Sequence, residues 1–341
     1  MSEISGGGSN EGTSSGTEMD NSAEVGSSVE TGGATEMNGA NEVGTSSETN
    51  GAVEIGSAKE TSGNEIAINP EQTSHGMNQI LETPTTLEQA QISVEHFHNQ
   101  SIAQILDMNG KYISEADRGR IEDGVNSIKA IEHNPNSGRS GAFRTMNGKS
   151  SIEVSALSKD QMERTTKHET NHFASKNREI IVPMPDKGGH MVYQTVGMRH
   201  TSWFHNNTTG ENSGFETKGR GLNEGMTTMY TNEQLSALSK EKGEAAEREG
   251  VYSHATEVCK QLQETMGKDA LGDAYYGGKT MALQEKMDAM GGKGTFEQFQ
   301  SSMDKTISKD YAERVQGMKE AQAILAKLGE MNNGASCIIQ I

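Results

Sequence analysis

Two histidines stand four residues apart, at His168 and His172, and the glutamate Glu169 directly follows the first of them. On an α-helix this spacing stacks two side chains on one face about one turn apart, whereas in a strand it separates them by about 13 Å. Among regular structures, only a helix therefore lets both imidazoles reach one metal ion with a carboxylate beside them. The pattern predicts a helical metal site. The alternative is a surface helix that carries two histidines and no metal.

Capping signals locate this helix independently of the histidines. Ser158 can cap its N-terminus with Gln161 at the third helical position, which is the capping-box pattern. Leu157 and Met162 occupy the two positions of a hydrophobic staple around the same cap. The sequence therefore predicts that a helix begins at Ser158 and that residues 168–172 lie two to four turns inside it.

A catalytic zinc site needs a third protein ligand in addition to two histidines and a water. The metzincin continuation of the pattern requires a glycine and a histidine where this chain has Ser175 and Arg178, so that class is excluded. The downstream segment Asn223–Gly225 instead resembles the N-E-G segment that supplies a glutamate ligand in gluzincin-type zincin metallopeptidases. By these two motifs, residues 140–330 resemble bacterial gluzincins, several of which are secreted effectors or toxin domains.

The resemblance implies a zinc metalloendopeptidase with an α+β, zincin-like fold: a small mixed β-sheet, an active-site helix and a helical C-terminal subdomain. Its zinc ligands would be His168, His172 and Glu224. Glu169 would be the general base that takes a proton from the zinc-bound water during peptide-bond hydrolysis. Gluzincins often carry an acid four residues after the glutamate ligand, where it orients a histidine, and this chain has Thr228 there.

Other assignments stay open at this level. Glu224 could instead be a solvated acid on a helix, with a histidine as the third ligand. The rival ligands are His190, His200 and His205. The transition state also needs a hydrogen-bond donor besides zinc. Our first choice is Tyr230, a turn and a half beyond Glu224. The alternative donors are Tyr252, His254, Tyr275 and Tyr276.

Residues 1–76 differ in composition from the rest of the chain. Glutamate recurs every six residues from Glu18 to Glu60, and thirteen acids face the single base Lys59, a net charge of −12. A hexad repeat could form a β-helix, but the residues that would fill its core are small or polar. They cannot offset a backbone ordering cost of about 1–2 kcal/mol per residue. We therefore expect a disordered acidic leader in residues 1–76.

We expect order to begin near Pro84, with a helical platform in residues 77–135 and a zincin-like catalytic domain in residues 136–335. Apolar residues at helical spacing predict helices over about 87–106 and 114–131. Three histidines of the platform lack a paired acid or a ligand spacing, so we expect them to be surface or capping residues and not metal ligands. They are His96, His98 and His133.

The dipeptide Asn147-Gly148 between two β-compatible runs predicts a hairpin. The expected strands are Ala142–Met146, Ser151–Ser155, Glu179–Met184 and His190–Val196. A polar, glycine-bearing stretch over residues 206–221 suggests a substrate-contacting loop, and the pattern is helical from Glu241 onward. We expect an extended substrate to lie along an exposed strand near Ile152 by β-augmentation.

Outside the leader the chain carries 35 acids and 29 bases, which argues against broad binding to nucleic acid or to anionic membranes. No apolar run reaches the roughly 18 residues of a membrane span, and the N-terminus lacks the features of a secretory signal. We therefore expect a protein or peptide substrate, and either a cytoplasmic location or export by a non-classical or specialised route. Two other functions stay open: a non-enzymatic secreted interaction protein with an accidental or structural histidine pair, and a zinc enzyme for another hydrolysis.

Overall fold

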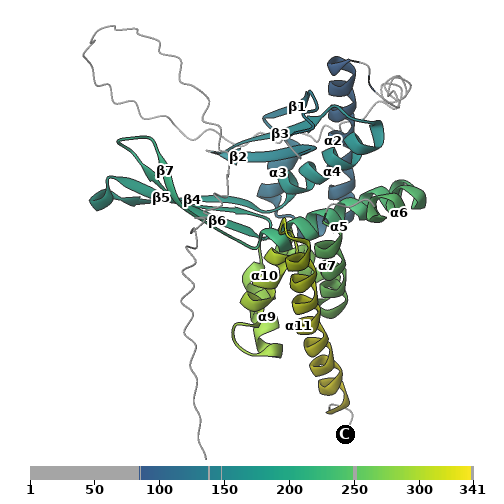
Figure 1. The fold of residues 1–341 in the computed structure, drawn as a ribbon, viewed down its shortest axis with the longest axis vertical. Coiled ribbons are helices and arrows are strands. Elements are labelled where there is room, and N and C mark those ends of the chain that lie inside the picture. The colour runs from purple at the N-terminus through teal and green to yellow at the C-terminus, as the bar shows by residue number, and fades with distance from the viewer. Residues whose placement is uncertain (1–83, 85, 137–138, 147, 249–251, 339–341) are drawn as a thin grey trace, which may run out of the picture. The chain divides into compact units, whose positions relative to one another are not determined.

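The computed structural model shown in Figure 1 describes residues 84, 86–136, 139–146, 148–248 and 252–338. The leader expected in residues 1–76 lies outside these residues, as does the rest of the chain up to residue 83. The described part mixes helices with strands, which confirms the α+β class.

The first sheet has three strands in the order β1-β3-β2, with β3 parallel to β1 and antiparallel to β2. The strands are β1 (Ser127–Ile131), β2 (Gly141–Met146) and β3 (Lys149–Ser155). Two helices, α2 (Leu87–Asn109) and α4 (Lys159–Ala174), pack on this sheet and on each other. A 3-10 turn (Gly110–Tyr112) and α3 (Glu115–Glu122) connect α2 to β1. The residues of this core are Ala90, Val94, Phe97, Ala130, Ile152, Val154, Met162 and Phe173.

Helix α4 begins where the capping signals predict. Ser158 is the N-cap residue, although its hydroxyl bonds the side chain of Gln161 at 3.0 Å instead of accepting a backbone N–H. Leu157 and Met162 both pack into the core beneath the sheet, as expected of a hydrophobic staple. The cap therefore fixes the start of the helix that carries both histidines.

The predicted hairpin between β2 and β3 is confirmed. Met146 pairs with Lys149, and Gly148 in the turn has a φ of +71°, which glycine adopts without strain. The exposed strand expected near Ile152 is wrong, because β3 is the central strand and Ile152 is fully buried. The edge strand of this sheet that lies against α4 is β2.

Two expectations for the first part of the chain are wrong for the same reason. The helix expected over residues 114–131 ends at Glu122, Gly124 turns the chain with a φ of +81°, and residues 127–131 form β1. Backbone pairing of β1 with β3 and burial of Ala130 outweigh the helical spacing. The boundary expected between residues 135 and 136 therefore cuts through one sheet, and the described residues belong to one compact unit.

A second sheet was only half predicted. It is an antiparallel meander of four strands, β4 (Asn177–Met184), β5 (Gly189–Val196), β6 (Arg199–Asn206) and β7 (Asn212–Lys218), and a 3-10 turn (Pro185–Lys187) joins β4 to β5. Strands β4 and β5 confirm the expected pair, whereas β6 was not predicted. The loop expected over residues 206–221 is wrong, because β7 pairs with β6 there and Phe215 stacks on Trp203. Figure 1 shows this sheet projecting from the helices.

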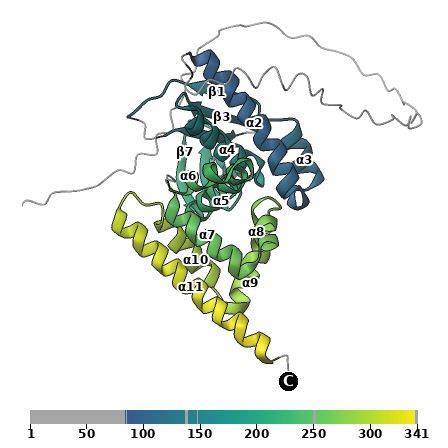
Figure 2. The same ribbon diagram turned by 90° about the vertical axis from the view of Figure 1, so that its right-hand side faces the viewer.

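The rest of the described chain is helical, as expected. The helices are α5 (Arg220–Leu238), α6 (Lys240–Arg248), α7 (Ser253–Met266), α8 (Lys268–Tyr275), α9 (Thr280–Gly291), α10 (Thr295–Lys305) and α11 (Tyr311–Ile338). Figure 2 shows α11 running along α7 and α10. Helix α5 packs against α4 and also against α7 and α10, so it joins the two cores. None of the helices in the described ranges is long and apolar enough to cross a membrane.

His98 is buried, with 4% of its surface exposed, so the surface alternative is wrong for this histidine. Its Nδ1 lies 2.9 Å from the hydroxyl of Thr170, which itself donates to the carbonyl of Thr166. Because the Thr170 hydroxyl uses its hydrogen on Thr166, it can only accept from His98. The hydrogen of the neutral imidazole therefore lies on Nδ1. Burial lowers the pKa of His98 to about 4.

We expect this histidine to make folding stability depend on pH. Because the pKa of His98 is lower in the folded chain than the usual 6.5, the unfolded chain binds the proton more tightly between pH 6.5 and 4. Its contribution is complete above pH 6.5 and falls by up to about 3 kcal/mol as the pH drops through this window. Denaturant unfolding of wild type and His98→Asn, which keeps an N–H near Nδ1, should show a shallower acid dependence in the variant. Equal dependences would contradict a buried neutral His98.

Candidate metal centre

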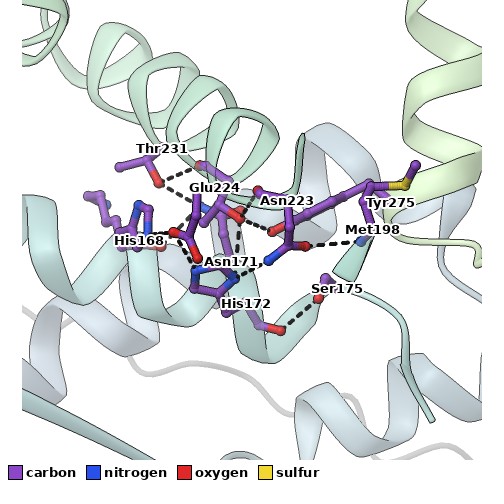
Figure 3. Close-up of polar contacts among 11 residues, drawn as sticks. His168, Asn171, His172, Ser175, Met198, Asn223, Glu224, Thr231 and Tyr275 are labelled. Atoms are coloured by element: carbon purple, nitrogen blue, oxygen red, sulfur yellow. Dashed lines mark hydrogen bonds and ion pairs between the residues drawn. The ribbon is translucent and has the colours of Figure 1, made fainter. Parts of the chain in front are cut away.

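The side chains of His168 and His172 on α4 converge with Glu224 near the start of α5 (Figure 3). Oε2 of Glu224 lies 3.2 Å from Nε2 of His168 and 3.4 Å from Nε2 of His172. Two ligand atoms bound tetrahedrally to one zinc ion at about 2.0–2.1 Å lie about 3.4 Å apart. The two separations to Glu224 and the nitrogen and oxygen donor set thus fit a zinc ion, and the structure brings together the three residues that the resemblance implies as ligands, with their donor atoms within 4.8 Å of one another.

A buried hydrogen-bond network fixes α4 against α5 at this point. Asn171, which directly precedes His172 on α4, donates to the hydroxyl of Thr231 at 3.1 Å. Its Oδ1 accepts from the hydroxyl of Tyr276 at 2.8 Å and from Gln234 at 3.4 Å. All four side chains are buried, and buried polar groups with satisfied partners define one arrangement of the elements that carry them. The spacing between the histidines and Glu224 is set by this network.

His172 is oriented through its second ring nitrogen. Nδ1 lies 3.2 Å from Oγ1 of Thr227 and 3.2 Å from Nδ2 of Asn223, whose Oδ1 accepts the backbone N–H of Met198. The Thr227 hydroxyl donates to the carbonyl of Asn223 and lies 2.7 Å from the hydroxyl of Tyr275. When Nε2 of a histidine binds a metal, Nδ1 carries the proton and needs an acceptor. Of the two side chains beside Nδ1, only the Thr227 hydroxyl can accept this hydrogen, because Nδ2 of Asn223 only donates and bonds Nδ1 only in the other tautomer.

Thr228, where the family resemblance places an orienting acid, makes no hydrogen bond to either histidine in the described structure. Its Oγ1 is buried without a hydrogen-bond partner among the described residues. The contact expected for Thr228 is made one position earlier on α5 by Thr227, with support from Tyr275. A neutral hydroxyl therefore stands where a carboxylate was expected.

Burial and the neighbouring charges shift the pKa in opposite directions for Glu224, His168 and Glu169. Burial disfavours the Glu224 carboxylate, but the charge of His172 and hydrogen bonds from both histidines outweigh it and hold the pKa of Glu224 well below its usual value. Burial likewise opposes protonation of His168, but its bond to Glu224 and the charge of Glu169 raise its pKa. Burial raises the pKa of Glu169, against the charges of both histidines and a backbone hydrogen bond from Phe143.

A pocket of about 340 Å³ opens beside the cluster, and His168 and Glu169 form part of its wall. Tyr252, just before α7, lines the same pocket and stacks on the His168 ring, with centroids 5.9 Å apart and planes at 22°. Burial raises the pKa of the Tyr252 hydroxyl, so it remains a proton donor at neutral pH. The pocket therefore joins the predicted base to one available hydrogen-bond donor.

The other expected donors lie elsewhere. Tyr230 is 1% exposed and packs on the rings of Tyr275 and Tyr276, so the structure places our first choice in the helical core. Tyr275 and Tyr276 are engaged by the networks described above. His254 packs near the ring of Tyr311. Of the five, Tyr252 is the one that shares a pocket with Glu169 in the described part of the chain.

The rival ligands do not join the cluster. His190, His200 and His205 lie on β5 and β6, and within the described ranges the group that could hold a metal ion consists of His168, His172 and Glu224.

Sequence reasoning missed Arg199, which begins β6. Burial lowers the pKa of this guanidinium, against the opposing charges of Glu224 and Glu169. Arg199 thus adds a positive charge within electrostatic reach of the cluster. No short motif marks it, because it reaches the site only through the unpredicted strand β6.

The chain matches no protein-family model, and searches of curated proteins and of solved structures found no match.

We expect Thr227 to support metal binding. Thr227→Val removes the acceptor for Nδ1–H of His172 and should weaken zinc binding by about 10- to 100-fold. Thr227→Ser keeps the hydroxyl and should bind zinc nearly as tightly as wild type. Competition with a chromophoric chelator measures each affinity.

Thr228→Val is the matched control, because its hydroxyl has no partner among the described residues. A large loss of zinc affinity in Thr228→Val, with none in Thr227→Val, would contradict this account and favour the position implied by the family resemblance.

Proposed function

We propose that the chain is a zinc-dependent metalloendopeptidase with a gluzincin-like site on a zincin-like fold. The observation that carries the proposal is the convergence of His168, His172 and Glu224 beside a pocket that also contains Glu169. Two imidazoles and one carboxylate are a ligand set that catalytic zinc uses in peptidases. The position of residues 168–172 on helix α4 and of Glu224 on helix α5 supports the assignment.

Zinc, when bound, supplies a Lewis acid that polarises the substrate carbonyl and lowers the pKa of a water molecule toward neutrality. Glu169 accepts the proton of the attacking water and then delivers it to the leaving amine. Its raised pKa makes the carboxylate a better proton acceptor, and the backbone N–H of Phe143 on β2 helps to hold it in place. The hydroxyl of Tyr252 donates a hydrogen bond to the developing oxyanion.

The edge strand β2 is suited to hold an extended substrate beside this base. A Cβ on Gly141 would lie 2.4 Å from Thr165 and 3.2 Å from the Glu169 side chain, so the glycine lets β2 approach α4 closely. Near the C-terminal end of β2, the side chain of Gln194 on β5 donates to the carbonyl of Thr145. That carbonyl is therefore already paired and is not free to bind a peptide. A peptide would therefore add backbone hydrogen bonds at the Gly141 end of β2.

The roles of the ligands and the base can be separated by two substitutions. We expect Glu169→Gln to retain about one zinc ion per chain but to lose cleavage by about 100-fold or more, because it removes the proton acceptor and leaves the ligands. His168→Ala should lose both zinc and cleavage. Elemental analysis after removal of loosely bound metal, together with digestion of denatured protein substrates, measures both properties. Cleavage by Glu169→Gln at the wild-type rate would exclude the mechanism.

A pair of tyrosine variants tests the donor. Tyr252→Phe should lower kcat by about 100-fold without changing zinc content, because only a transition-state hydrogen bond is lost. Tyr230→Phe should leave kcat unchanged, since this hydroxyl is buried and has no partner among the described residues. Steady-state kinetics on one peptide substrate compares the two. The opposite ranking would favour Tyr230 as the donor.

A further inference from the structure

Two of the histidines that do not join the cluster face each other across the second sheet. His190 of β5 and His205 of β6 are direct cross-strand partners, and their ring centroids lie 4.9 Å apart. Both side chains are half-buried on the same sheet face. Because cross-strand partners are held in register by the backbone, this pairing is built into the β5–β6 ladder.

Each ring is also held in one tautomer. Nδ1 of His190 lies 3.0 Å from Oδ1 of Asn207, and Nδ1 of His205 lies 2.8 Å from Oδ1 of Asn212. An amide oxygen only accepts hydrogen bonds, so each Nδ1 carries the hydrogen. Each neutral ring therefore keeps its lone pair on Nε2, the arrangement found in metal-ligating histidines whose other nitrogen donates to an oxygen.

We propose that His190 and His205 form a second metal site, which binds a borderline divalent transition-metal ion such as Cu²⁺, Ni²⁺ or Zn²⁺ through their Nε2 atoms. Two nitrogens on one such ion lie about 3–4 Å apart, which neighbouring rings with these centroids can provide. Imidazole ligands suit these ions, whereas Mg²⁺ and Ca²⁺ require oxygen ligands. Water would complete the coordination. The site is independent of the proposed peptidase function.

The chain contains a built-in reporter for this site. Its sole tryptophan, Trp203, lies two residues before His205 on β6, so both side chains point to the same face of the sheet. Bound Cu²⁺ or Ni²⁺ quenches the fluorescence of a nearby indole. Quenching of Trp203 fluorescence therefore reports metal binding at His190 and His205.

The experiment uses the full chain with His168→Gln, His172→Gln and Glu224→Gln, which removes the first cluster without leaving a buried carboxylate unpaired, and titrates it with Cu²⁺, Ni²⁺ and Mg²⁺. We expect saturable quenching by one equivalent of Cu²⁺, weaker binding of Ni²⁺ as the general affinity order dictates, and no effect of Mg²⁺. Adding His190→Gln or His205→Gln should abolish the saturable quenching.

His200→Gln in the same background is the matched control. His200 is on β6 five residues before His205 and therefore faces the opposite side, where it pairs with Thr195. This variant should be quenched like its parent, and circular dichroism should show the same fold for all variants. The proposal is overturned if the parent shows no saturable quenching, if His190→Gln and His205→Gln are quenched like the parent, or if His200→Gln abolishes quenching equally.

Discussion

The structure around the site depends on one constraint, which is that the carboxylate of Glu224 is buried between two imidazoles at the contact of α4 and α5. A buried charge costs several kcal/mol unless it is paired, so these helices can pack closely only if cationic or hydrogen-bonding partners meet the carboxylate. His168 and His172 meet that requirement, and a zinc ion would do so more completely. The network around Asn171 holds the helices at the separation at which this pairing works.

The elements that could be predicted carry their own local signals. The capping residues at Ser158 determine where α4 begins, the Gly148 turn determines the β2–β3 hairpin, and the spacing of His168 and His172 requires a helix. Each of these depends on residues within a few positions of one another. Glu224 could be named only through family resemblance, because nothing near it in sequence shows that α5 packs on α4.

The parts that could not be predicted depend on partners distant in sequence. Residues 127–131 become a strand because β3 lies beside them, and β7 forms because β6 offers it a partner. For the same reason the sequence could not favour Tyr252 over the other four candidate donors, because its stacking on the His168 ring depends on tertiary packing. Tertiary packing also hid Thr227, whose contact with His172 depends on the rotation of α5 relative to α4. Local pattern thus identified the chemical groups, and tertiary packing decided which of them meet.

In the proposed function, α4 and α5 together supply two imidazoles and one carboxylate to a single zinc ion. X-ray absorption spectroscopy of the full chain, carrying His190→Gln and His205→Gln and loaded with one equivalent of zinc, tests it most directly. The account predicts four light ligands at about 2.0–2.1 Å, of which two are imidazoles and the others oxygen. Glu224→Ala should reduce the oxygen contribution and weaken binding. A spectrum with three or more imidazoles, with a sulfur ligand, or unchanged in Glu224→Ala would contradict the claim.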